Sequence, residues 1–304
     1  MFNVKSTTQA VAYLLGKAGG SLHCHDLMRM LYAADRSMYA EFEEPMTGDL
    51  AVSMEYGPAL SATLSLMEGR MEPGYWCELI SPLKNDVLSL ASGIDPANFG
   101  EISEADQERL DAVFAKYSSK SAWNEADIAS EFPEWGCPDG GGRPIDVAKI
   151  LLAVGKDPNV IPSIMESLEE MDALERAWDR LEREESMPML SNDGIEMAPK
   201  QVLSMRTELP SGEKRENYYI VLTEAVPWPE PAAQPDPQDP KEELCVLLVP
   251  WRIKKAGQYF DECCILRKGD HPQITQESWI DYRRAKVMPV RTIKKGIVLG
   301  MLRL

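Results

Sequence analysis

Two short segments of the sequence hold residue types that could do chemistry, and together they contain all three histidines of the chain. The first is His23-Cys24-His25, three candidate metal ligands in consecutive positions. The second is Gly269-Asp270-His271-Pro272, where an imidazole stands beside a carboxylate. A histidine with a pKa of about 6.5 can carry protons at cellular pH, and an adjacent acid can hold its tautomer. The segments therefore suggest a metal site and a proton-transfer site.

The first segment is more typical of a helix start than of a metal site. A structural zinc ion needs about four donors, usually in paired short spacings, and the cysteines form no C-x-x-C pair. Leu27, Met30, Leu31 and Ala34 follow with the spacing of a helix packed on a core. We therefore predict that His23-Cys24-His25 only precedes this helix, with no metal and no other cofactor.

The second segment could belong to a ribonuclease. Cleavage of RNA without a metal ion needs a base for the 2′-hydroxyl, an acid for the leaving oxygen and cations around the phosphate. His271 and Asp270 could transfer the proton, while Arg252 and Arg283 could hold the phosphate. The alternative is a tight turn in which the Asp and His side chains bond to neighbouring backbone groups.

Length and composition predict a protein of two domains without a membrane span. A chain of 304 residues can form two cores of ordinary size. No segment approaches the roughly 20 apolar residues that cross a bilayer, and the N-terminus lacks signal-peptide features, so we expect a cytoplasmic protein. Six cysteines without a framework spacing fit reduced thiols.

The net charge of −17 is unevenly distributed. Residues 1–190 carry 15 basic and 33 acidic side chains, whereas residues 251–304 carry 12 basic and 5 acidic ones. This asymmetry favours an acidic module joined to one that can approach a polyanion, although ordinary scatter of surface charge would also produce it.

The first part of the chain has helical periodicity. Apolar spacing predicts helices over residues 6–18, 25–41 and 59–67, from residues 103 and 121 onward, and over residues 163–185. Gly57-Pro58 is expected to end a short strand and to open the helix at Ala59.

The second part is rich in short β-branched and aromatic runs. They predict strands over residues 202–206, 218–223, 244–250, 263–266, 286–290 and 297–302. Six prolines from Pro227 to Pro240 are expected to keep a loop, residues 226–241, out of the sheet. The predicted fold class is α+β, with a mainly α-helical domain over residues 1–188. A small β-barrel or sandwich, expected to be an SH3-like barrel, then spans residues 189–304.

Several motifs in the helical part occur in a characteristic order. They are Tyr13-Leu14-Leu15 with Gly19-Gly20, Leu27 to Asp35, Thr47-Gly48-Asp49, Tyr56-Gly57-Pro58, Ser121-Ala122-Trp123, Pro133-Glu134-Trp135, and the segment from Pro144-Ile145 to Gly155-Lys156. In order and spacing, residues 6 to about 185 resemble the Panacea domain of SocA-like antitoxins.

This resemblance implies a bacterial or prophage protein and does not by itself imply an enzyme. It would neutralise a toxin by direct binding, or deliver the toxin to a protease as an adaptor. The toxin-contact candidates within the motifs are Tyr32, Tyr56, Gly57, Pro58, Trp123 and Trp135. The alternative for Tyr56-Gly57-Pro58 is structural, because Gly and Pro also make a tight turn into a helix.

A second resemblance concerns the C-terminal part. The strand Tyr218–Thr223, the Gly269–Pro272 turn and the run Ser278–Tyr282 look like small barrel toxins of the PemK/MazF kind. Glu216-Asn217 stands where those toxins usually have an arginine-proline pair. The resemblance implies a ribonuclease-like toxin fold with an RNA target.

The two resemblances lead to a functional prediction with one alternative. We predict a fused toxin–antitoxin protein for phage defence, in which the Panacea domain neutralises a toxin-like C-terminal domain until a phage protein triggers release. The alternative is a non-enzymatic antitoxin or proteolytic adaptor whose C-terminal barrel binds a partner protein, with the toxin on a separate chain. The sequence does not set the oligomeric state.

Overall fold

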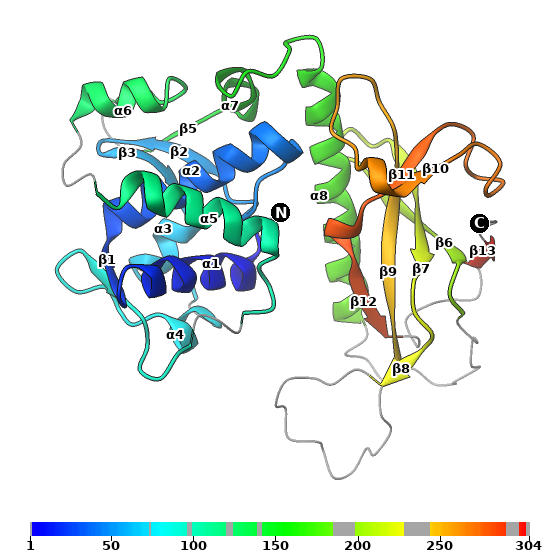
Figure 1. The fold of residues 1–304 in the computed structure, drawn as a ribbon, viewed down its shortest axis with the longest axis horizontal. Coiled ribbons are helices and arrows are strands. Elements are labelled where there is room, and N and C mark those ends of the chain that lie inside the picture. The colour runs from blue at the N-terminus through cyan, green and yellow to red at the C-terminus, as the bar shows by residue number, and fades with distance from the viewer. Residues whose placement is uncertain are drawn as a thin grey trace. The chain divides into compact units, whose positions relative to one another are not determined.

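The chain forms two compact units, Met1–Leu168 and Glu169–Leu304. The computed structural model describes residues 2–72, 74–95, 99–119, 124–138, 142–184, 198–227, 244–289 and 298–301. Helices and strands are both abundant, as an α+β fold requires (Figure 1). The domain boundary predicted after residue 188 lies outside the described residues and stays a prediction.

Several helices of the first unit begin directly after a residue whose side chain caps them. They are α1 (Val4–Lys17), α2 (Cys24–Phe42), α3 (Ser61–Met67), α4 (Trp76–Leu79), α5 (Glu104–Tyr117), α6 (Glu125–Glu131), α7 (Val147–Ala153) and the first part of α8 (Ile161–Glu184). Ser103 and Asp106 form a reciprocal capping box at the start of α5, which satisfies two amide groups that have no partner within the helix. The predicted helices over residues 6–18 and 25–41 are confirmed as α1 and α2.

Helix α2 is the centre of the first unit. It contacts α1, α5 and α7 as well as two strands, and Figure 1 shows α1, α2 and α5 side by side. Leu27, Leu31 and Ala34 on α2 are fully buried, and they join α1 residues such as Leu14 and Leu15 in one core. Burial of this apolar surface is the main source of the unit's stability.

The predicted role of Gly57-Pro58 as the start of a helix is wrong. Residues Gly57–Leu60 form strand β3, which pairs with β2 (Ala51–Met54) across a two-residue loop, and α3 begins only at Ser61. Gly57 has a φ of +120°, which favours glycine, and the four residues of β3 are buried. Pro58 is tolerated because β3 is an edge strand of the sheet β3-β2-β5, with β5 at Arg143–Pro144.

Another small sheet holds the start of α2 in place. Strand β1 (Ser21–His23) pairs with β4 (Val87–Ser89), so that Leu22 lies opposite Leu88. The backbone N–H of Cys24 then donates to the carbonyl of Asp86 at 2.7 Å. The first turn of α2 is therefore fixed to the turn that precedes β4.

The second unit is a twisted antiparallel sheet. Its described strands are β6 (Gln201–Glu208), β7 (Lys214–Val221), β8 (Val226–Pro227), β9 (Leu244–Ile253), β10 (Ile265–Leu266), β11 (Ser278–Ile280), β12 (Lys286–Pro289) and β13 (Val298–Met301). They follow the order β10-β11-β9-β7-β6-β13, with β8 and β12 also paired to β9. No pairing among these strands closes the sheet, so the expected SH3-like barrel is not confirmed.

Alternation along the strands gives this sheet two apolar faces. One face forms a core with α8: Met171, Leu174, Leu203, Tyr219, Val221, Val246, Leu248 and Met288. The neighbouring positions form the core of the other face: Val202, Ile220, Val249, Trp251, Leu266, Ile274 and Ile280. Figure 1 shows α8 running along the first of these faces.

Six predicted strands are confirmed as β6, β7, β9, β10, β12 and β13, with small differences in their ends. The Pro-rich loop over residues 226–241 lies mostly outside the described residues. Its first two residues form β8, where Pro227 pairs with Leu244, so the expectation that the whole segment avoids the sheet is wrong. A proline can occupy such a strand end because no further ladder hydrogen bond is needed there. Among the described residues, no helix is both long and apolar enough to cross a membrane.

The buried face of α2 can be tested with a matched pair of leucines. Leu31→Ala should lower the free energy of unfolding by about 2–5 kcal/mol, because a fully buried side chain leaves a cavity. Leu152→Ala on α7, where the leucine is 50% exposed, should change it by about 0.5 kcal/mol or less. Urea unfolding followed by circular dichroism at about 222 nm, a helix signal, measures both. Equal effects of the two substitutions would contradict this packing.

Candidate functional site

His23 caps the start of α2, as the helix-start interpretation predicted. Its Nδ1 accepts a hydrogen bond from the backbone N–H of His25 at 3.4 Å. The two imidazole rings meet edge to face, with centroids 5.1 Å apart. Within the same turn, Asp26 and Arg29 form an ion pair at 3.1 Å. The His23 side chain thus satisfies a backbone N–H at the start of the helix, and Asp26 and Arg29 neutralise each other's charge.

The tip of the β2–β3 hairpin lies against this helix start. The ring of Tyr56 stacks on the ring of His25 with centroids 4.8 Å apart and an interplanar angle of 20°. Tyr56 nevertheless remains 57% exposed. The pKa of His25 is lowered by burial and then by the charges of His23 and Arg29. The stack therefore presents a neutral aromatic surface near pH 7.

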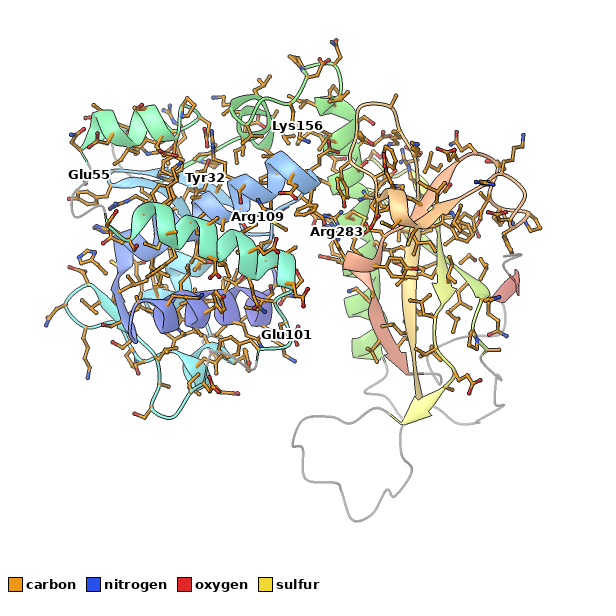
Figure 2. All side chains as sticks on the ribbon, in the orientation of Figure 1. Tyr32, Glu55, Glu101, Arg109, Lys156 and Arg283 are labelled. Atoms are coloured by element: carbon orange, nitrogen blue, oxygen red, sulfur yellow. The ribbon has the colours of Figure 1, made fainter. Side chains whose placement is uncertain are left out.

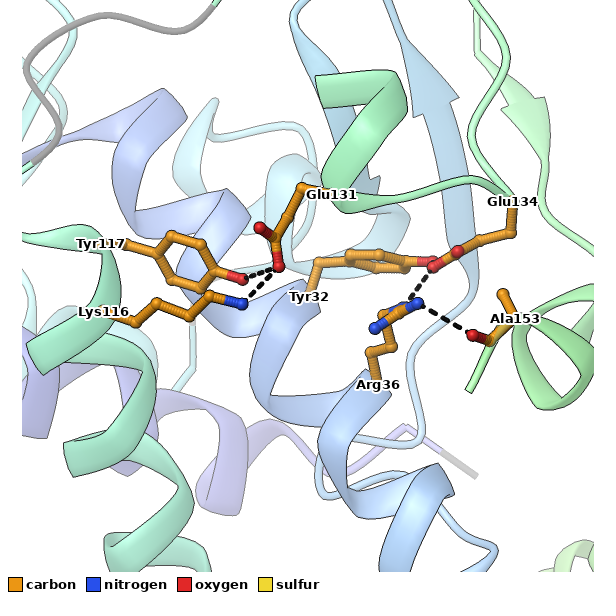
Figure 3. A network of polar contacts seen from close by, with 7 residues as sticks. All are labelled: Tyr32, Arg36, Lys116, Tyr117, Glu131, Glu134 and Ala153. Atoms are coloured by element: carbon orange, nitrogen blue, oxygen red, sulfur yellow. Dashed lines mark hydrogen bonds and ion pairs between the residues drawn. The ribbon is translucent and has the colours of Figure 1, made fainter. Parts of the chain in front are cut away.

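Tyr32, another toxin-contact candidate, lies in the interior. It is 1% exposed, and its hydroxyl donates to Oε1 of Glu134 at 2.6 Å (Figure 3). The same oxygen accepts from Nε of Arg36 at 2.8 Å, while Nη2 of Arg36 donates to the carbonyl of Ala153 at 3.3 Å. Burial raises the pKa of Tyr32, and the nearby Glu134 raises it further. Tyr32 thus ties α2 to the segment after α6.

A parallel contact joins α5 to α6. The hydroxyl of Tyr117 donates to Oε1 of Glu131 at 2.8 Å, and the ammonium group of Lys116 donates to the same oxygen (Figure 3). Burial raises the pKa of Tyr117, with a further contribution from this hydrogen bond. The last residue of α6, Glu131, and Glu134 of the following segment are therefore both held by carboxylate bonds to tyrosine, which fixes the C-terminal end of this helix.

The other contact candidates are distributed between the core and the hairpin. Trp135 is 6% exposed and donates from Nε1 to the carbonyl of Met54 at 3.0 Å. Gly57 and Pro58 lie in the buried strand β3. Trp123 lies outside the described residues. Among the described members of the set, Tyr56 is the one with a largely exposed side chain.

Two buried aspartates organise the loop between α2 and β2. The carboxylate of Asp35 accepts from the backbone N–H groups of Met46 and Thr47, each at 3.0 Å, and from the Thr47 hydroxyl. Asp49 accepts from the N–H groups of Ala62 and Thr63 at 2.9 and 2.8 Å, which caps α3. Our sequence interpretation assigned no role to these carboxylates. Their signal was that Asp35 ends the Leu27–Asp35 motif and Asp49 ends the Thr47-Gly48-Asp49 motif.

In the second unit, the Gly269–Pro272 segment forms a turn. His271 is 2% exposed, and its Nδ1 accepts from the backbone N–H of Gln273 at 3.2 Å. Asp270 instead accepts from the N–H of Arg267 at 2.7 Å, so its carboxylate bonds to backbone. Burial lowers the pKa of His271, which favours the neutral imidazole. The two side chains thus have the backbone contacts that the turn interpretation requires.

The candidate cations Arg252 and Arg283 meet at Asp281. This aspartate is fully buried, and its carboxylate oxygens lie 3.5 Å from Arg252 and 3.6 Å from Arg283. Arg284 approaches the same carboxylate at 3.8 Å and pairs with Glu175 of α8 at 3.3 Å. The structure therefore groups these arginines around an internal carboxylate. His271 lies against Trp251 instead, with ring centroids 5.9 Å apart.

The family model described as Antitoxin SocA-like, Panacea domain, matches residues 27–136. This stretch contains Asp35, Tyr56 and Glu134, and so includes the contacts that hold α2, the hairpin and α6. No curated protein and no solved structure matches the chain. The predicted Panacea resemblance is thus confirmed over residues 27–136, and the PemK/MazF resemblance finds no support. A SocA-like domain suggests a role related to toxin–antitoxin systems.

The carboxyl group of Asp35 predicts a pH dependence of stability. Burial raises its pKa to about 7 from a model-compound value of 3.8. The folded state therefore holds a proton that the unfolded state releases, and the free energy of unfolding should fall between about pH 4 and pH 7. For this one group, the slope is up to about 1.4 kcal/mol per pH unit.

The comparison variant is Asp35→Asn, which keeps the shape of the side chain but cannot ionise. The stability of the wild type relative to this variant should decrease steadily from pH 5 to pH 7 in urea unfolding. A difference that is constant with pH, or that increases, would contradict the pKa shift.

Proposed function

We propose that this protein is the antitoxin of a toxin–antitoxin pair, and that its first unit neutralises a toxin on a separate chain by direct, non-enzymatic contact. The match of residues 27–136 to SocA-like antitoxins supports the class. The observation that carries the proposed mode of action is the exposed Tyr56–His25 stack on the surface of that unit.

Tyr56 has the properties of an interface anchor. Tyrosine is enriched at the centres of protein interfaces, where a large ring buries apolar area and its hydroxyl can still bond. Stacking on His25 already limits the rotamers of Tyr56, so its ordering on binding costs less conformational entropy than that of a free side chain. By contrast, Tyr32 and Trp135 stabilise the interior that supports the hairpin.

Contacts in the second unit speak against a ribonuclease site there. A ribonuclease would need His271 and Asp270 at a phosphate together with Arg252 and Arg283. Asp270 bonds to a backbone amide, and the two arginines approach Asp281. This arrangement favours the structural interpretation of each residue over catalysis.

A fused toxin–antitoxin protein is the second candidate. The observation that favours it is the basic character of residues 251–304, which carry 12 basic against 5 acidic side chains. In this case the second unit would act on an anionic target such as RNA, and a phage protein would release it. A covalent link would keep the antitoxin at an effective concentration of about a millimolar. An adaptor that delivers the toxin to a protease would differ from both by lowering the toxin level.

The two candidates differ in what the full chain does when Tyr56 is removed. We expect the full-length wild type and Tyr56→Ala to be harmless when each is expressed alone. A screen of genomic fragments from the source organism should then yield one that arrests growth alone but not with the wild-type chain. Tyr56→Ala should reduce this rescue at least about tenfold in surviving cells, since truncation of an interface anchor costs about 2 kcal/mol or more of binding free energy. Leu152→Ala serves as the exposed control.

Each other outcome has a defined meaning. A Tyr56→Ala chain that arrests growth by itself would overturn the proposal in favour of the fused protein, above all if adding His271→Ala restored growth. Rescue that is unaffected by Tyr56→Ala would remove Tyr56 from the interface. Loss of the toxin protein during rescue, checked by immunoblot, would contradict neutralisation by binding alone and support the adaptor.

A further inference from the structure

The chemical surroundings of Tyr56 indicate which kind of partner it can bind. We call the half-buried His25 and the exposed residues around the ring the Tyr56 surface: His23, His25, Glu55, Tyr56 and Asp86. They come from three places that the fold holds together, namely the start of α2, the β2–β3 loop and the turn before β4. The Cys24–Asp86 backbone bond and the His25–Tyr56 stack connect these places.

The turn before β4 has a fixed shape that places Asp86 next to α2. Asn85 and Asp86 both have positive φ, 50° and 59°, and Lys84 pairs with Val87 across them. Two positive-φ residues in a two-residue loop make the tight hairpin turn for which Asn and Asp are preferred. Burial lowers the pKa of His25 and raises the pKa of Cys24; the exposed carboxylate of Asp86 opposes the first change and adds to the second. The negative charge of Asp86 therefore acts on the His25–Tyr56 stack.

Two exposed carboxylates border the stack, those of Glu55 and Asp86. Arg29 is largely buried and paired with Asp26, and the exposed Arg143 lies on β5 opposite Ser53 of β2. Lys84 lies on the β4 turn and contributes one positive charge. His25 is neutral near pH 7, because burial and then the charges of His23 and Arg29 lower its pKa. An aromatic face bordered by carboxylates attracts a cation.

We infer that the Tyr56 surface binds a basic segment of the partner protein, with an arginine or lysine side chain over the Tyr56 ring and its charge near Glu55 and Asp86. Residues 1–190, with 33 acidic and 15 basic side chains, would also attract such a segment at a distance. The identification of that partner as a toxin rests on the proposed function. The inference that the bound segment is basic does not rest on the proposed function.

Binding of a synthetic peptide to the full-length protein tests the inference. The probe is a fluorescein-labelled peptide of Arg-Gly-Ser repeats, compared with a Glu-Gly-Ser peptide of the same length by fluorescence anisotropy near pH 7.5. The arginine peptide should bind and the glutamate peptide should not. Tyr56→Ala should raise the Kd about tenfold, whereas Tyr56→Phe should keep it within about twofold, since the ring face is what binds the cation.

A comparison of two glutamates separates binding at the Tyr56 surface from general attraction of a basic peptide to an acidic protein. Figure 2 shows Glu55 and Glu101 at opposite ends of the first unit. Glu55→Gln should weaken binding several-fold, and Glu101→Gln, which removes the same charge elsewhere, should leave it nearly unchanged. Circular dichroism confirms that each variant is folded.

Three results would overturn the inference. They are equal losses from Glu55→Gln and Glu101→Gln, an unchanged Kd for Tyr56→Ala, and preferential binding of the glutamate peptide. These results are separable from the fate of the proposed function. Toxin rescue that depends on Tyr56 without arginine-peptide binding would leave the antitoxin proposal intact and reject the basic partner. Peptide binding at Tyr56 without any rescued toxin would support the basic partner and reject the antitoxin proposal.

Discussion

The first unit depends on the burial of α2, a helix that carries polar side chains into the core. A buried carboxylate, guanidinium or hydroxyl is costly unless it is hydrogen-bonded, so each of these groups must find a partner from another part of the chain. Asp35 binds the Met46–Thr47 backbone, and Tyr32 and Arg36 share Glu134. The internal partners of α2 therefore fix the positions of segments that are far away in sequence.

This constraint explains why the hairpin tip is left exposed. The interior contacts involve Tyr32, Trp135 and the strand β3, and they fix the β2–β3 hairpin on the side that faces the core. Tyr56, at the loop, then rests on His25 with more than half of its side chain exposed. The second unit follows a similar rule, because Arg252, Arg283 and Arg284 gather around the buried Asp281. In both units, residues that look functional in the sequence support the fold: Tyr32 and Trp135 in the first, Arg252 and Arg283 in the second.

Sequence reasoning predicted elements better than contacts. Apolar periodicity and capping residues correctly predicted α1, α2, α5 and the main strands, because these signals are local. It failed at Gly57–Leu60, where pairing with β2 overrides the helix-start character of Gly-Pro. The family motifs marked Tyr32, Tyr56 and Trp135 alike as contact candidates, since a motif does not separate core from surface. The Tyr32–Glu134 bond spans 102 residues, and no local pattern encodes such a partner.

The most direct test of the account is to observe individual tyrosine rings in the full-length protein while a basic peptide is added. The chain has ten tyrosines, which can be labelled with ¹³C and assigned by single Tyr→Phe substitutions. The account predicts that the Tyr56 ring signal shifts on titration with the arginine peptide while the Tyr32 signal, from a ring that is 1% exposed, stays in place. Shifts at Tyr32 or at tyrosines of the second unit, with Tyr56 unmoved, would contradict it.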